Sequence, residues 1–197
     1  AMLASRLRCT GRGQAGRSLE TSWGEIMTVA TVHDFQRELV FSQEASDEPF
    51  WDAVYRKAFP NMVSHTLCTG NNEAQHQGID RIVLLANGRV LKIDEKKRRE
   101  TRKDILLEYV SVDTTGALGW IEKDLPIDYL AYAFMDRKRV YLWDWCMLRR
   151  AWIAYKADWL SRYKIPPAQN NGYKTLSVAV PIERLRKCVL LAAVIQL

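Results

Sequence analysis

The sequence lacks the short motifs that mark several common classes of protein. Its four cysteines, Cys9, Cys68, Cys146 and Cys188, form no CxxC pair, so neither a zinc site nor a disulfide scaffold is indicated. They predict free thiols in a reducing cytoplasm. The three histidines do not cluster, and the chain has no glycine-rich phosphate loop and no serine nucleophile elbow. Nothing here indicates a zinc enzyme, a P-loop protein or a serine hydrolase.

Long hydrophobic runs are also absent. The longest one, VLLAAVIQL at residues 189–197, is far shorter than the roughly 20 residues that a membrane-spanning helix needs. The sequence therefore predicts no membrane partner, and we expect this run to form a buried C-terminal helix.

What remains is an ordinary globular composition with an excess of positive charge. Hydrophobic residues make up 48% of the 197 residues and charged residues 26%, close to the averages for soluble domains. The net charge of +6 favours an anionic partner such as nucleic acid. Residues 1–26 carry four arginines and no acid before Glu20, which predicts a poorly ordered basic segment. Residues 27–197 predict a single α+β domain.

The predicted elements alternate between helices and strands along the chain. Helices are expected over residues 33–43, 46–59 and 146–163, with a last one opened by Pro181. Strands are expected at residues 62–69, 105–112 and 175–180, and hairpins at 78–97 and 128–145. Together they predict a central mixed sheet of about six strands flanked by helices.

The helix expected over residues 146–163 has one strongly apolar face. Leu148, Trp152, Tyr155 and Trp159 recur at steps of four, three and four residues, which is the spacing of a single helix face. We therefore expect these aromatic rings to pack in the core and not to stack on nucleic-acid bases.

The hairpin at residues 78–97 has acids at its open end. Asp80 lies on the first strand, and Asp94 and Glu95 lie at the far end of the second. Like charges side by side on neighbouring strands repel each other, by up to about 1 kcal/mol. A divalent cation would offset this repulsion, and magnesium prefers hard oxygen ligands such as carboxylates. The hairpin therefore predicts a site for magnesium or manganese.

The type of turn decides which acid faces Asp80. A two-residue Asn-Gly turn would pair Asp80 with Glu95 and put Lys97 on the same face, whereas a three-residue loop would pair it with Asp94 and put Lys96 there. The sequence permits both registers. The second register is preferred, because it places Glu95 on the opposite face, where Arg81 can neutralise it.

The arrangement of these residues resembles the PD-(D/E)XK nuclease superfamily, which includes many restriction endonucleases and Holliday-junction resolvases. The chain shares with it a helix with an acid, a strand, GID on the second strand and DEK on the third. The resemblance covers roughly residues 46–112 and implies a restriction-endonuclease-like core. The proline expected before the first Asp is replaced by Gly78-Ile79, and the second core helix is hard to place.

The resemblance also implies roles for particular residues. Asp80 and Asp94 would hold one or two magnesium ions, and Lys96 would act on the nucleophilic water. Glu95 would serve through its backbone carbonyl or as a substitute acid. The acid of the first helix, which helps to bind the metal, would be Glu48 or Asp52, since the two are four residues apart on one helix face.

A run of bases follows the acids directly. The segment KKRRETRK at residues 96–103 holds six basic residues and one acid, and phosphate binding needs this kind of charge. Glu108 interrupts the next apolar strand. It is expected to be either a further active-site acid or, as we favour, the partner of a base such as Lys123. Nucleic-acid contacts are predicted for Lys97, Arg98, Arg99, Arg102 and Lys103.

We therefore expect a magnesium-dependent endonuclease that is cytoplasmic and acts on DNA. Nucleases of this superfamily often cut two strands as dimers, so a homodimer is expected by analogy. The alternative is a catalytically inactive nuclease-like fold that serves as a nucleic-acid-binding or protein-assembly module, of the kind found in phages and mobile elements. In the simplest interpretation, the hairpin acids and bases are only neighbouring charges on a solvated strand end.

Overall fold

The computed structural model describes residues 48–68, 72–189 and 192–197. The basic segment predicted for residues 1–26 and the helix predicted for residues 33–43 lie outside the described residues. The first described element is the helix α2 (Glu48–Ala58), which confirms the prediction made from the apolar face of this segment. Its buried residues are Trp51, Val54 and Tyr55.

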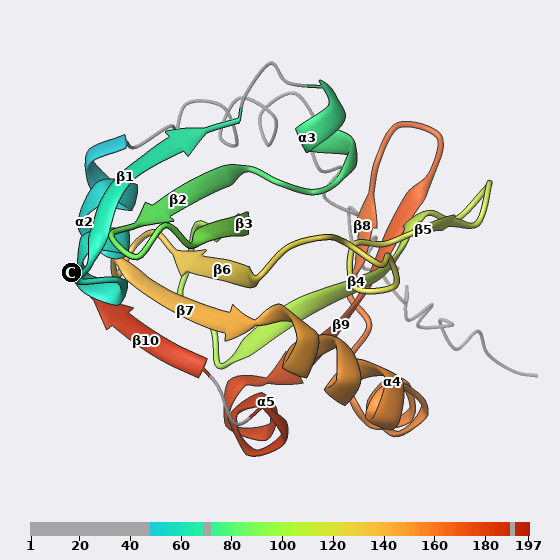
Figure 1. Cartoon of the computed structure of the whole chain (residues 1–197). Helices are drawn as coiled ribbons and strands as arrows, with labels where there is room; N and C mark the ends of the chain where they lie inside the picture. The colour runs from blue at the N-terminus through green and yellow to red at the C-terminus, as the bar shows by residue number, and fades with distance from the viewer. Residues whose placement is uncertain (1–47, 69–71, 190–191) are drawn as a thin grey trace, which may run out of the picture. The chain divides into compact units, whose positions relative to one another are not determined.

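A mixed sheet of six strands forms the centre of the fold, in the order β1-β2-β3-β6-β7-β10 (Figure 1). The neighbouring strands are antiparallel except for β3 and β6, which are parallel. This confirms the predicted α+β fold with a mixed sheet. The strands are β1 (Met62–Leu67), β2 (Arg81–Leu85), β3 (Val90–Arg98), β6 (Tyr129–Phe134), β7 (Arg139–Asp144) and β10 (Ala192–Gln196).

A second sheet of four strands has the order β5-β4-β9-β8. The strand predicted at residues 105–112 belongs here and not to the central sheet, because β4 pairs with β9 along most of its length. Parallel strands need a crossover connection, and β4 and β5 form part of the one between β3 and β6. The strands are β4 (Asp104–Val112), β5 (Ala117–Leu118), β8 (Pro167–Gln169) and β9 (Lys174–Pro181).

Three further helices are described, α3 (Asn72–His76), α4 (Trp145–Arg162) and α5 (Ile182–Cys188). The loop predicted at residues 70–77 thus contains a short helix. The backbone N–H of Met147 donates to Asp144 Oδ1 over 2.9 Å and caps the start of α4. Pro181 immediately precedes α5, as predicted. None of the described helices is long and apolar enough to cross a membrane.

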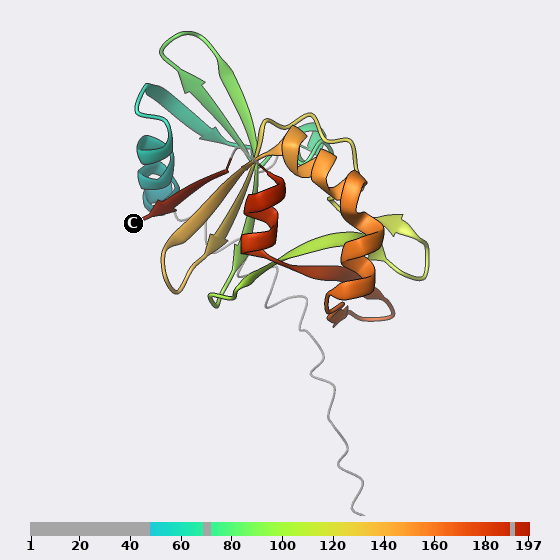
Figure 2. The same ribbon diagram turned by 90° about the horizontal axis from the view of Figure 1, so that it is seen from below.

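The central sheet buries both of its faces, and its strands alternate between two clusters of core residues. Along β6, Leu130, Tyr132 and Phe134 join the first cluster, which also contains residues of β4, β9, α4 and α5. Ala131 and Ala133 join the second cluster, which contains the buried face of α2. The helix α2 therefore covers one face of the central sheet, and the second sheet with α4 and α5 lies over the other (Figure 2).

Two predictions are wrong, one about the secondary structure of the C-terminal run and one about the packing of Tyr155. The C-terminal run forms the edge strand β10, which pairs with β7 from Ala192 to Gln196, and not a helix. A short apolar run cannot be assigned to helix or strand by periodicity alone, and this one contains the β-branched Val194 and Ile195. In α4, Trp152 and Trp159 are fully buried, as expected, but Tyr155 remains 39% exposed.

Candidate metal and active site

The β2–β3 hairpin has the register that brings Asp80 opposite Asp94. Arg81 pairs with Ile93 and Leu84 with Val90, so continuing the ladder by one residue places the two acids side by side. The loop closes with a hydrogen bond from the N–H of Gly88 to the carbonyl of Leu85 over 2.9 Å. Gly88 has a positive φ of 80°, as expected for a three-residue loop with a bulge.

This register puts Lys96 on the same face as the two acids. Side chains alternate along a strand, and Ile93 packs in the cluster with α2, so Asp94 and Lys96 point to the opposite face, toward the second sheet. Lys96 Nζ lies 2.5 Å from Asp94 Oδ1. The preferred register, in which Asp94 and Lys96 share a face with Asp80, is therefore confirmed, and the register with Glu95 and Lys97 facing Asp80 is wrong.

Backbone hydrogen bonds hold Asp80 in place, and Asp94 is buried beside it. The backbone N–H of Glu95 donates to Asp80 Oδ2 over 2.7 Å, and the N–H of Asp80 donates to the carbonyl of Ile93 over 3.0 Å. Asp94 is only 1% exposed. Its Oδ1 binds Lys96, but its Oδ2 is buried and has no hydrogen-bond partner among the described residues. A buried oxygen without a donor is costly, so this atom is suited to a ligand that the protein itself does not supply.

The electrostatics of the site follow from burial and from its crowded carboxylates. Burial, together with the neighbouring charge of Asp80, raises the pKa of Asp94 to about 7, although Lys96 works against this shift. For Lys96, burial opposes the charge, but the carboxylates of Asp94, Asp80 and Glu108 outweigh it and raise the pKa of its ammonium group above the usual value. Lys96 is therefore protonated at neutral pH.

Glu108 is a further acid of this site, brought to it by the second sheet. It lies on β4, near both Lys96 and Lys123, the partner favoured from the sequence. Burial raises the pKa of Glu108, and both lysines oppose this rise. The only sequence signal for this role was a charged residue within an apolar strand, because the approach of β4 to β3 depends on the crossover.

The backbone around Glu108 is fixed by a close approach that requires glycine. The N–H of Ile121 donates to the carbonyl of Glu108 over 3.1 Å, and the N–H of Gly119 donates to Tyr109 over 3.1 Å. A Cβ atom on Gly119 would lie 2.2 Å from the Glu108 carbonyl oxygen, closer than atoms can approach. Any larger residue at position 119 would displace the strand that carries Glu108.

The carboxylates of Glu95 and Glu48 do not join Asp80 and Asp94. Both bind Arg81, which is fully buried: its Nε donates to Glu95 Oε1 over 2.6 Å, and its Nη1 donates to Glu48 Oε2 over 3.0 Å. Tyr55 also donates to Glu95, over 2.8 Å. Glu95 is drawn to this face because the strand alternation places it beside Arg81, whose buried charge needs a partner.

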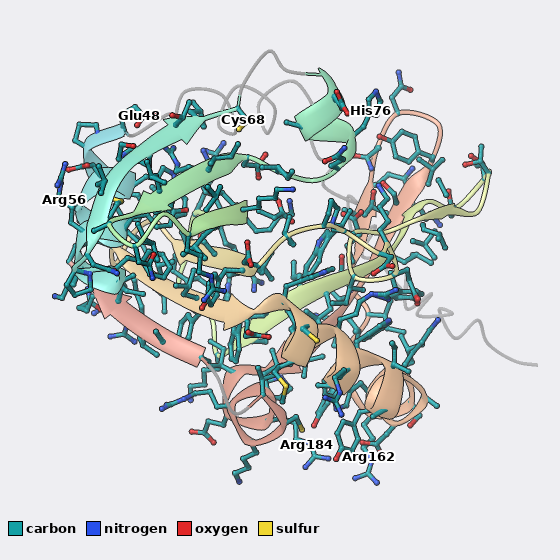
Figure 3. The ribbon with its side chains drawn as sticks, viewed as in Figure 1. Glu48, Arg56, Cys68, His76, Arg162 and Arg184 are labelled. Atoms are coloured by element: carbon teal, nitrogen blue, oxygen red, sulfur yellow. The ribbon has the colours of Figure 1, made fainter. Side chains whose placement is uncertain are left out.

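The other helix acid lies in the same group on the α2 side of the sheet. Asp52 Oδ1 is 3.1 Å from Nε2 of His65, and its Oδ2 accepts a hydrogen bond from Arg56 over 2.8 Å. Figure 3 shows Glu48 and Arg56 on α2, at the side of the central sheet where β1 begins. The structure therefore assigns the acids of α2 to a structural network and does not bring them to the hairpin acids.

The predicted nucleic-acid contacts lie at the end of β3 and in the turn that precedes β4. Lys97 and Arg98 are the last residues of β3, and Arg98 Nη1 donates to Asp104 Oδ1 over 2.8 Å. Arg102 forms an ion pair with Glu100. Lys103 precedes β4. The basic run is thus the end of one strand and a turn, not a single binding helix.

The donors at the site suit a hard divalent cation. Within residues 48–68, 72–189 and 192–197, no group of three or more acid, histidine or cysteine side chains is placed to hold a metal ion. Magnesium does not need such a cage, because it commonly binds one or two carboxylates and completes its shell with water and substrate phosphate. Asp80 and Asp94, with the unpartnered Oδ2 of Asp94, fit this kind of binding.

Comparisons with known proteins add no relative from which a role could be transferred. No protein-family model, curated protein or solved structure matches the chain.

Proposed function

We propose that this chain is a metal-dependent nuclease of the PD-(D/E)XK type, which hydrolyses phosphodiester bonds in DNA at Asp80, Asp94 and Lys96. One observation carries the proposal. The hairpin register puts two carboxylates side by side with a lysine on the same face, and one oxygen of Asp94 is buried without a donor. A bound cation would offset the cost of leaving that buried oxygen without a donor.

The order of elements supports a restriction-endonuclease-like core. A helix, α2, precedes three antiparallel strands, β1 to β3, and a fourth strand, β6, lies parallel to β3. The chain departs from the superfamily in the crossover between β3 and β6. The superfamily has its second core helix there, whereas this chain has the strand β4. In our proposal β4 compensates for this change by supplying Glu108 to the site.

Asp80 and Asp94 are the residues that would hold the divalent cation. When bound, magnesium would polarise the scissile phosphate and lower the pKa of a water molecule. The protein's own part is to hold the two carboxylates against their mutual repulsion. The hydrogen bond from the Glu95 N–H to Asp80 and the contact between Lys96 and Asp94 do this.

Lys96 acts as a donor and not as a base. Because its raised pKa keeps it protonated, it can orient an attacking water and stabilise negative charge that develops on the phosphate. Glu108 keeps this ammonium group charged and, in the proposal, limits the positions that Lys96 can adopt. Proton removal from the water then falls to a carboxylate or to solvent.

The direct test is cleavage of supercoiled plasmid and of a labelled branched duplex with magnesium, with manganese and with EDTA. We expect cutting with either metal and none with EDTA. Absence of cutting in all three conditions, with DNA binding retained, would contradict the nuclease and favour a binding module built on the same fold.

A further inference from the structure

A cleft of about 990 Å³ lies where distant parts of the chain meet, and the hairpin acids are not among its lining residues. It lies between the turn before β4, the start of β7, the segment after α4 and the junction of β9 with α5. Its acids are Asp104 and Glu183. The basic side chains that line it are Arg102, Lys103, Arg139, Lys164 and Arg186.

The positive charge of this cleft is only partly neutralised within the described part of the chain, because Glu183 is its one acid without an ion pair there. Asp104 is already paired with Arg98, over 2.8 Å. Within residues 48–68, 72–189 and 192–197, no acid forms an ion pair with Lys103, Lys164 or Arg186. Cations gathered in a concave surface focus a positive potential, so an anion bound there would relieve their mutual repulsion.

Backbone hydrogen bonds fix the main chain at two of these lysines. The N–H of Ile182 donates to the carbonyl of Lys103 over 2.9 Å, and the N–H of Ala179 donates to the carbonyl of Lys164 over 2.9 Å. Both donors belong to the β9–α5 junction. The main chain that carries these two lysines is therefore ordered without a ligand, which reduces that part of the entropy cost of binding.

The strand β3 runs from the hairpin acids toward the cleft. Asp94, Lys96 and Arg98 occupy alternate positions of this strand and share one face. At about 3.3 Å per residue, Arg98 lies roughly 13 Å from Asp94. Its guanidinium reaches Asp104 at the edge of the cleft. This span corresponds to roughly four nucleotides of one strand of a duplex, at 3.4 Å each.

The lining favours phosphates over bases. Tyr141 is the single aromatic residue among the described lining residues, and it is only 8% exposed. Stacking on bases needs an accessible ring, whereas contacts to phosphate need only cations and carry no sequence information directly.

We propose that this cleft binds the sugar-phosphate backbone of the nucleic acid whose scissile phosphate lies at Asp80 and Asp94, without reading its sequence. The proposal rests on the nuclease function and extends it: Arg139, Lys164 and Arg186, which are remote from the basic run in sequence, become substrate-binding residues.

The test compares two charge-matched double variants, Lys164→Gln with Arg186→Gln in the cleft and Arg56→Gln with Lys57→Gln on α2. Both pairs remove one lysine and one arginine, and α2 lies on the other face of the central sheet. Affinity for a labelled duplex is measured in EDTA over a series of salt concentrations. The cleft variant should bind roughly tenfold more weakly for each lost contact at about 0.1 M salt.

The slope of log affinity against log salt should also fall by about two in the cleft variant and stay unchanged in the α2 variant. Two duplexes of unrelated sequence should bind the parent equally well. An unchanged slope in the cleft variant, an equal loss in the α2 variant, or no binding by the parent would overturn the proposal. Melting midpoints confirm that both variants are folded.

The two proposals can fail separately, because binding in EDTA does not depend on cleavage. A parent that binds through the cleft but never cuts would contradict the nuclease and leave the binding surface standing. A parent that cuts, while its cleft variant keeps the full salt dependence, would contradict the cleft alone.

Discussion

Replacing Asp80 by asparagine should reduce metal-dependent cleavage by roughly 10²- to 10³-fold, the scale expected when a single electrostatic contact to the transition state is removed. The amide can still accept the hydrogen bond that Asp80 Oδ2 receives from the Glu95 N–H over 2.7 Å. The fold should therefore survive, and only the negative charge is lost. DNA binding should stay the same or become tighter, since one charge that repels phosphate has gone.

The matched control is Asp113→Asn. Asp113 is exposed, and its Oδ1 accepts a hydrogen bond from the N–H of Lys174 over 2.8 Å, which asparagine can also accept. The cleavage rate measured under single-turnover conditions should fall in Asp80→Asn and should equal that of the parent in Asp113→Asn. Equal rates in the parent and in Asp80→Asn would remove this aspartate from the chemistry.

The second large effect is a loss of stability, expected when Arg81 is replaced on the α2 side of the central sheet. Arg81→Met should lower the free energy of unfolding by about 3–5 kcal/mol, the usual loss when one partner of a buried ion pair is removed. The methionine would leave Glu95, whose side chain is 6% exposed, with Tyr55 as its remaining donor. The contact with Glu48 that ties α2 to β2 would also be lost.

Urea unfolding followed by tryptophan fluorescence measures this loss, with the slope m as a check on two-state behaviour. The double variant Arg81→Met with Glu95→Gln removes both charges. It should recover part of the lost stability, because no buried charge is then left unpaired. A loss below about 1 kcal/mol in the single variant, the range of exposed ion pairs, would show that this network does not hold α2 in place.

Much of the hairpin could be predicted from the sequence because local rules govern it. The Asn-Gly turn and the two-residue alternation limit the register to two choices, and the position of Arg81 beside Glu95 favours the observed one. The helices α2 and α4 follow from their apolar spacing in the same way. The local pattern was enough to predict that Asp80, Asp94 and Lys96 share one face of the hairpin.

The remaining features depend on contacts between distant residues. The position of Glu108 near Lys96 depends on the crossover that carries β4 into a second sheet, and strand length alone does not reveal to which sheet a strand belongs. Likewise, Glu48 was expected at the metal because it lies on the first helix, but the buried charge of Arg81 draws it to the opposite face. The basic cleft is formed by residues from separate segments, so no run of sequence indicates it.

The measurement that tests the central claim most directly is a manganese titration followed by thermal melting, at about pH 6 and about pH 8. Asp94 faces Asp80 and Lys96, and its pKa of about 7 leaves it mostly protonated at the lower pH. A carboxylate must lose its proton to bind metal, so metal-induced stabilisation should be larger at the higher pH.

The parent and Asp113→Asn should both gain stability with manganese, by about 2.7 kcal/mol at a hundredfold excess over the dissociation constant. Asp94→Ala should gain none at either pH. No gain in the parent, or the same gain in Asp94→Ala, would contradict a divalent-metal site at the hairpin acids.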